Sequence, residues 1–340
     1  MGLVFWGDLY YGYDDIRPDI ERLASCFNGN GYALVLNLEG AYPENTSHKI
    51  KKRGEHLAQS ERTFEVLNRL NVVGVSLCNN HIFDFGTQGL KNTLSMLESN
   101  NISVCGVVLS DTRKYPYMDI VDGENTYRIY AATDPFEESV CSADGGTGCC
   151  TICDLLKKEI PKYSKNWYNI AFLHTGFEYN TLPAIRTIKE CRHLIDNGFD
   201  YVICSHPHIS QPYEIYKGRP IFYSLGNFYF SEFRKEFHRK KIKPGNRGAC
   251  DLGVGIAIDG RNYKNIFVEY NDETDDTSIV DGVIHRLEFN SVREYTREYR
   301  KNRNNHNPIL MGDKLDNAKM WMMNRIYSVY GVYRKIARKV

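Results

Sequence analysis

Short runs of β-branched and aliphatic residues recur along the chain, and each run ends in a cluster of small and polar residues. Apolar runs of this length indicate strands that are covered on both faces. The clearest runs cover residues 3–8, 32–40, 72–81, 170–179 and 201–208. Further strands are expected over 127–133, 220–230 and 252–259.

Helical patterns lie between these runs. Apolar residues recur at helical spacing over 60–70, 87–101 and 184–198. Strands alternating with helices indicate an α/β fold with a largely parallel sheet. Ligands of such sheets bind at the carboxyl ends of the strands. The polar residues that close the strands are therefore the candidate site.

These closing residues are carboxylates, an amide and imidazoles. They are Asp8, Glu39, Asn80, His81, His174, Glu178, His206 and His208. A single histidine after a strand is usually structural, but this whole set at one edge predicts a site for one or two divalent metal ions. Mn, Zn, Fe and Mg all fit this donor set. Such a centre would bind an anionic oxygen and leave one imidazole free to protonate a leaving group.

The same residues belong to motifs that resemble a known family. The motifs are Gly7-Asp8, Asn37-Leu38-Glu39-Gly40, Asn79-Asn80-His81 with Asp84-Phe85-Gly86, the stretch 174–179, His206-Pro207-His208 and the stretch 223–228. Their order and spacing resemble the CapA family of capsule and poly-γ-glutamate biosynthesis proteins, which is related to the calcineurin-like metallophosphoesterases. The resemblance implies a four-layer α/β/β/α sandwich, over residues 1–270, with a two-metal site at the sheet edge.

The resemblance also implies a role for each residue. Asp8 and His208 would hold one metal, and Asn80, His174 and His206 the other, with Glu39 between the two. His81 would be the catalytic acid, held in its tautomer by Asp84, and Glu178 would serve the metal or the substrate. Tyr10 stands where the phosphoesterases usually carry a histidine, so one ligand of the first metal is missing.

Two functional hypotheses of different classes follow from this resemblance. The first is a metal-dependent, phosphoesterase-like hydrolase or transferase of capsule or surface-polymer biosynthesis, acting on an anionic, phosphate-linked or γ-glutamyl intermediate. The second is a non-catalytic, membrane-associated scaffold that binds polymer or partner enzymes. Formation of a γ-linked peptide bond is a weaker hypothesis, because the glycine-rich stretch 144–148 lacks the lysine of a phosphate-binding loop.

Composition narrows these hypotheses. A net charge of +1, from 43 basic and 42 acidic residues, argues against a nucleic-acid partner. Ten scattered cysteines favour a reducing compartment, and a structural zinc at Cys149, Cys150 and Cys153 is disfavoured because no second Cys-x-x-Cys pair exists. The first residues lack the pattern of a signal peptide and no apolar run reaches membrane-spanning length, so we expect a cytoplasmic protein, with peripheral membrane attachment open.

The end of the chain is more polar than the rest. Residues 271–308 are expected to form a polar extension and linker, and 309–340 a basic amphipathic helix. That helix would lie on an anionic membrane surface or pack on its own domain, and both interpretations stay open. The basic run Lys51-Lys52-Arg53 could meet an anionic substrate, although a solvated charge run is the favoured interpretation.

Overall fold

The structure is a computed structural model. It describes residues 2–301 except 53, 111–113, 135–139, 142–146, 159, 162–164, 232–249, 272 and 290. The predicted basic helix of 309–340 and the last part of the predicted extension and linker, 302–308, lie outside the described residues. No helix among the described residues combines the length and apolar character needed to cross a bilayer.

The larger of two main sheets has eight strands, with β1 near its centre. Its order is β17-β16-β15-β1-β2-β3-β4, and β14 also pairs with β1. Strands β1 to β4 and β14 are parallel, whereas β15, β16 and β17 run antiparallel to their neighbours. The strands are β1 (Gly2–Tyr10), β2 (Tyr32–Leu38), β3 (Val72–Ser76), β4 (Ser103–Cys105), β14 (Asn227–Phe230), β15 (Leu252–Asp259), β16 (Asn262–Asn271) and β17 (Asp276–Val280).

The second main sheet has six strands in the order β12-β13-β11-β10-β8-β7. Its four inner strands are parallel and the two edge strands antiparallel. They are β7 (Met118–Asp122), β8 (Asn125–Thr133), β10 (Trp167–His174), β11 (Tyr201–Ser205), β12 (Ser210–Tyr216) and β13 (Arg219–Leu225). A small third sheet joins β5 (Val107–Val108), β6 (Lys114–Tyr115) and β9 (Gly148–Cys149).

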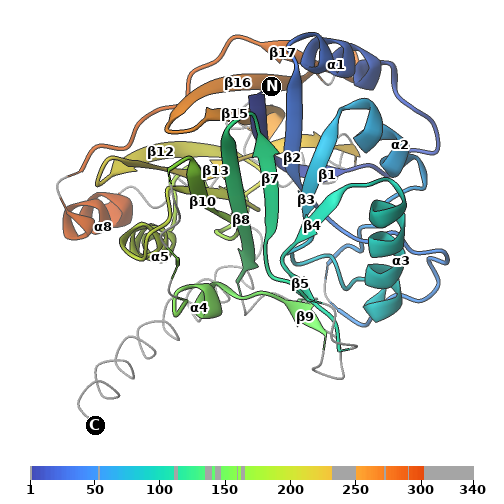
Figure 1. The fold of residues 1–340 in the computed structure, drawn as a ribbon, viewed down its shortest axis with the longest axis horizontal. Coiled ribbons are helices and arrows are strands. Elements are labelled where there is room, and N and C mark those ends of the chain that lie inside the picture. Colours follow the sequence, from blue (N-terminus) through green and yellow to red (C-terminus); the bar gives the residue numbers. More distant parts are fainter. Residues whose placement is uncertain are drawn as a thin grey trace.

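The two main sheets face each other, and helices cover their outer faces (Figure 1). Helices α1 (Pro18–Gly29), α2 (Arg62–Arg69) and α3 (Gly86–Ser99) pack on the larger sheet, and α4 (Ile152–Leu155), α5 (Ile185–Asp196) and α8 (Val292–Lys301) on the smaller one. An apolar core fills the space between the sheets, where the rings of Phe5 and Phe172 meet edge-on with centroids 5.9 Å apart. The predicted four-layer α/β/β/α sandwich is confirmed.

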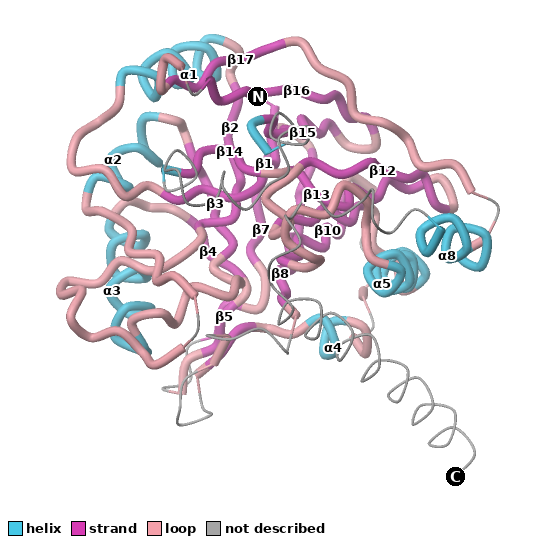
Figure 2. Tube along the Cα trace, turned by 180° about the vertical axis from the view of Figure 1, so that it is seen from behind, coloured by secondary structure: helices cyan, strands magenta, loops and turns pink. Residues whose placement is uncertain are grey.

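The region predicted as a polar extension contributes two elements to the sandwich. Strand β17 extends the larger sheet at its edge, and α8 lies beside α5 on the outside of the smaller sheet (Figures 1 and 2). Both elements bury little: α8 has one buried residue, Tyr295, whose hydroxyl donates to the carbonyl of Pro183. An edge strand and a one-sided helix are polar over most of their length, which is why the sequence pattern resembles a linker.

Candidate metal centre

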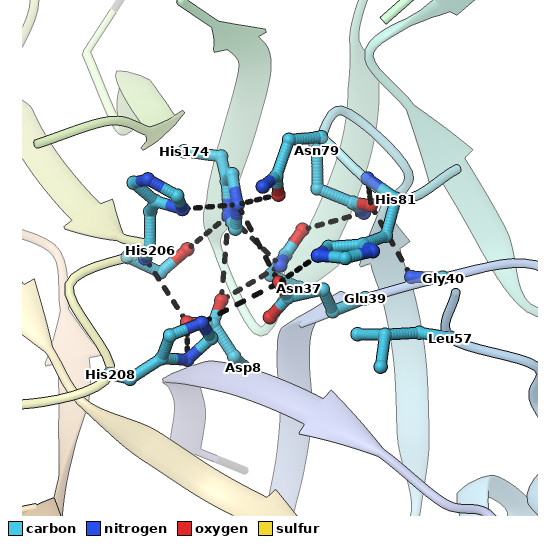
Figure 3. A network of polar contacts seen from close by, with 12 residues as sticks. Asp8, Asn37, Glu39, Gly40, Leu57, Asn79, His81, His174, His206 and His208 are labelled. Carbon is cyan, nitrogen blue, oxygen red and sulfur yellow. Dashed lines mark hydrogen bonds and ion pairs between the residues drawn. The ribbon is translucent and has the colours of Figure 1, made fainter. Parts of the chain in front are cut away.

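Six side chains from distant parts of the chain meet at the carboxyl ends of the strands, and Figure 3 labels all of them except Asn80. Asp8 lies late in β1, Glu39 follows β2, His174 is the last residue of β10, and two histidines follow β11. The set comprises all the predicted metal-binding residues: Asp8, Glu39, Asn80, His174, His206 and His208. The structure brings them together, and that they bind ions stays a prediction.

Asp8 is held by several donors. Its Oδ1 accepts a hydrogen bond from the Asn37 amide at 2.8 Å, and its Oδ2 accepts one from the backbone N–H of His206 at 3.1 Å. Nδ1 of His174 and Nδ1 of His208 each lie 3.6 Å from a carboxylate oxygen of Asp8. Burial raises the pKa of Asp8, but the hydrogen bond and charge of His174 and the charge of His208 outweigh it, so the pKa is lowered. Asp8 is therefore held in one orientation and favours its ionised form.

Glu39 is fully buried, and neither of its carboxylate oxygens accepts a hydrogen bond from any described residue. Nε2 of His208 lies 3.8 Å from Oε1, and Nε2 of His174 and of His81 each lie 3.9 Å from it. Burial, and then the charge of Asp8, raise its pKa well above the usual range. A buried carboxylate without donors is costly unless a cation neutralises it.

Asn80, His174 and His206 form the neighbouring group. Nε2 of His174 lies 2.9 Å from Oδ1 of Asn80 and 3.0 Å from Nδ1 of His206. Burial lowers the pKa of His174, so the ring favours its neutral form, which is the form that binds metals. Oε1 of Glu39 faces both groups, since it lies 3.9 Å from Nε2 of His174 and 3.8 Å from Nε2 of His208.

The donor types and their spacing fit a divalent ion. One ligand atom each from Asp8, Glu39 and His208 lies within 4.8 Å of the others, and no second such group of acidic, imidazole or thiol donors occurs in the described part of the chain. Carboxylate oxygens and imidazole nitrogens together suit Zn, Fe or Mn. Cys149, Cys150 and Cys153 form no group of this kind.

His81 lies beside this centre, with Nε2 toward Glu39 and Nδ1 held by Asp84. Its Nδ1 lies 2.8 Å from Oδ2 of Asp84, whose carboxylate also accepts the backbone N–H of Leu57 at 2.8 Å. Burial lowers the pKa of His81, and the hydrogen bond and charge of Asp84 oppose that effect. Because Nδ1 faces Asp84, Nε2 faces Glu39. The predicted pairing of His81 with Asp84 is present.

The basic run at 51–53 is not uniformly a solvated face, so the favoured interpretation was wrong for Lys52. Its side chain is 5% exposed and forms an ion pair with Asp84, and its Nζ lies 3.0 Å from Nδ1 of His81. Lys51 is exposed, as expected, and Arg53 lies outside the described residues. The contact between Lys52 and Asp84 has no signal in the sequence, because it requires the chain to fold back across about thirty residues.

Three asparagines without a role in the sequence prediction organise the centre. Asn37 bonds Asp8 and lies 3.2 Å from Nδ1 of His174. Asn79 donates to the Leu38 carbonyl at 2.8 Å and accepts the backbone N–H of His81 at 3.1 Å. Oδ1 of Asn227 lies 2.9 Å from Nδ1 of His208. All three lie inside the motifs quoted above, and this position is the sequence signal that could have identified them.

The backbone at the centre is strained. His206 and His208 have φ of 101° and 54°, values that residues other than glycine seldom adopt. Such outliers concentrate at functional sites, where surrounding contacts enforce them. Nearby, β1 passes so close to Gly226 that a Cβ on Gly7 would lie 1.9 Å from its carbonyl oxygen. Glycine at position 7 therefore lets β1 bring Asp8 into the centre.

Two predicted features lie at the margin of the centre. Glu178 is exposed in the turn after β10, and its charge adds to the raised pKa of Glu39. Tyr10, at the position of the missing histidine, is buried and packs on Phe230 with ring centroids 5.3 Å apart.

The chain is similar in sequence to capsule and PGA biosynthesis proteins. The chain is 29% identical over 225 residues to the PGA biosynthesis protein CapA of Bacillus subtilis, covering 65% of this chain and 58% of that protein. It is 28% identical over 187 residues to the capsule biosynthesis protein CapA of Bacillus anthracis, covering 52% and 44%. The matches thus span about half the length of these relatives.

Among solved structures, a phosphatase from Mycoplasma pneumoniae aligns with 88% of this chain and 98% of its own, at 12% identity and a TM-score of 0.45. The family model "Bacterial capsule synthesis protein PGA_cap" matches residues 5–232, a span that contains every residue of the candidate centre. The chain therefore belongs to the PGA_cap family of bacterial capsule synthesis proteins, the CapA family.

Proposed function

We propose that this protein is a metal-dependent phosphoester hydrolase of capsule or surface-polymer biosynthesis. The observation that carries the proposal is Glu39: a fully buried carboxylate without a hydrogen-bond donor among the described residues, with three imidazole nitrogens at 3.8–3.9 Å. A purely structural site would satisfy that carboxylate with N–H or O–H donors. A cation would satisfy it instead.

The chain divides the work between holding ions and handling protons. Asp8 and His208 would hold one cation and Asn80, His174 and His206 the other, with Glu39 between them. When bound, divalent cations act as Lewis acids toward an anionic oxygen and orient it. Asn37, Asn79 and Asn227 need not touch an ion, because they fix the carboxylate and imidazole ligands.

His81 is the group that moves a proton. Its Nδ1 faces Asp84, so Nε2 is the atom that faces the centre. Burial favours the neutral ring, but an anionic phosphoryl group bound beside it would raise the pKa again, since an opposite charge favours the protonated form. His81 then gives the Nε2 proton to the departing oxygen as the phosphorus–oxygen bond breaks. Water supplies the new oxygen and releases one proton to solvent, from which His81 is protonated again.

The substrate is proposed to be an anionic intermediate of the polymer, phosphate-linked or γ-glutamyl. Two relatives are named for PGA and capsule biosynthesis, which supports a polymer intermediate rather than a free nucleotide. Glu178, exposed beside the centre, is proposed to contact that intermediate or an ion.

The test combines metal analysis with a substrate screen. Protein purified without chelators is analysed for Mn, Zn, Fe and Mg, then assayed with aryl phosphomonoesters, aryl phosphodiesters and γ-glutamyl peptides. We expect one or two equivalents of a divalent metal, metal-dependent cleavage of a phosphoester, and loss of turnover in His81→Ala with the metal retained. Protein that binds no metal and cleaves none of these compounds would instead support the scaffold hypothesis.

A further inference from the structure

Lys52 belongs to a segment that folds back over the centre between β2 and α2. The segment is tied to Asp84 at both ends: the backbone N–H of Ile50 donates to the Asp84 carbonyl at 3.0 Å, and that of Leu57 to its carboxylate at 2.8 Å. His56 adds a tie within the segment, with Nε2 2.8 Å from the Ile50 carbonyl. Lys52 is thereby delivered to the far side of His81 from the metal centre.

A buried ammonium at this place needs a reason beyond stability. Taking a Lys–Asp pair out of water costs about as much as the pair regains, so an apolar pair of similar size would serve folding equally well. The side chains of Lys52 and Asp84 are 5% and 0% exposed, and their ion pair lies against the one imidazole that the proposed mechanism uses.

The two carboxylate oxygens of Asp84 contact different partners. Oδ2 of Asp84 accepts from Nδ1 of His81 and from Leu57, and Oδ1 faces the ammonium of Lys52. Lys52 therefore fixes the rotation of the carboxylate. Its Nζ also lies 3.0 Å from Nδ1, but both atoms are donors while Nδ1 serves Asp84, so Lys52 acts on the ring through Asp84. With Nδ1 bonded to Asp84, Nε2 lies 3.9 Å from Oε1 of Glu39.

We propose that Lys52 is a positioning residue that acts through Asp84 to hold His81 with Nε2 toward the metal centre. This inference rests on the proposed function, since it assigns Lys52 to the reaction that His81 would serve. Misplacing a reacting group by about 1 Å costs about a hundredfold in rate. Loss of Lys52 should therefore lower kcat by tenfold to a hundredfold and leave KM within about twofold.

The kinetic test compares four variants of the metal-loaded protein on the phosphoester that the wild type cleaves best. Lys52→Met should lower kcat as stated with unchanged metal content, and Lys52→Arg should recover most of the loss. Lys51→Met, the same change on the exposed neighbour, should match the wild type. His56→Gln loosens the same segment without touching Asp84 and should also retain kcat.

Three kinetic results would overturn the proposal. A raised KM with normal kcat would make Lys52 a substrate contact. An equal loss in His56→Gln would assign the effect to the segment as a whole. Unchanged kinetics in Lys52→Met would remove any role in the reaction.

A second readout does not depend on activity, so the positioning role and the proposed function can fail separately. Crystal structures of the wild type and of Lys52→Met are compared at His81. We expect the wild-type ring to keep Nε2 next to Glu39, and the variant ring to rotate away or to occupy two orientations. An unmoved ring in Lys52→Met would refute the proposal, whether or not the wild type cleaves an ester.

Discussion

Glu39→Gln gives the sharpest test of how the centre is neutralised. The substitution keeps the size of the side chain and removes its negative charge. The carboxylate is fully buried and accepts no hydrogen bond from a described residue. The substitution therefore removes no hydrogen bond of this kind from the metal-free protein. An unpaired buried charge is costly. Metal-free Glu39→Gln should therefore unfold at the same temperature as metal-free wild type or at a higher one.

The metal-loaded proteins should behave in the opposite way. A divalent ion at a hundred times its Kd stabilises a protein by about 2.7 kcal/mol, which for a chain of this size raises Tm by about 4 °C. Changes next to metal ligands already weaken metal binding by 10–100-fold. If Gln weakens it about a hundredfold, the same metal concentration equals the new Kd, and the stabilisation falls to about 0.4 kcal/mol, or about 1 °C.

The assay is thermal unfolding with increasing Mn²⁺ or Zn²⁺, followed by chelation to reverse the shift. Glu44→Gln makes the same chemical change at an exposed position and should keep the full metal-dependent rise in Tm. A wild-type rise that persists in Glu39→Gln would refute the assignment of Glu39. So would a clear loss of stability in the metal-free variant.

Three further predictions concern the packing and charges around the centre. The pKa of Asp84 is lowered from 3.8: burial raises it, but the hydrogen bond and charge of His81 and the charge of Lys52 outweigh that effect. Its stabilising contribution is therefore present above pH 3.8 and is lost as the pH falls through the lower folded pKa. In urea unfolding, the difference in free energy of unfolding between wild type and Asp84→Asn should be largest near pH 7 and small below pH 4. A difference that does not change with pH would contradict this. Phe172→Ala removes a 1% exposed ring between the two sheets and should lower the free energy of unfolding by about 3–5 kcal/mol; a urea-measured loss below about 1 kcal/mol would contradict the four-layer core. Gly7→Ala should lower Tm because its Cβ would lie 1.9 Å from a carbonyl oxygen, whereas Gly29→Ala, whose Cβ would meet nothing within 4 Å, should not; equal Tm values for the two would contradict the close approach of β1.

The layers of the fold could be predicted because local pattern and tertiary position agree. The run at 3–8 became β1, that at 201–208 became β11, and the helical spacing at 184–198 became α5. Buried parallel strands are apolar on both faces, so each run marks a strand without knowledge of its neighbours. The β17 and α8 elements lack this signal, since each exposes most of its surface.

The centre could be predicted only as far as strand ends and known motifs reach. Asp8, Glu39 and His174 lie at or near the carboxyl ends of parallel strands, and such ends meet at one edge of a sheet. Lys52 carries no such signal, because its burial depends on the chain folding back onto Asp84. Asn37 could have been found, since it precedes Glu39 by two residues and a strand places such residues on one face.

The central claim is that Asp8, Glu39 and His208, with Asn80, His174 and His206 beside them, hold divalent cations. Anomalous diffraction from crystals grown with Mn²⁺ tests it most directly. The account predicts one or two anomalous peaks at coordination distance, about 2.0–2.3 Å, from these donors, with Glu39 touching each ion. Crystals with saturating Mn²⁺ and no peak among these side chains, or with Glu39 bonded to N–H donors instead, would contradict it.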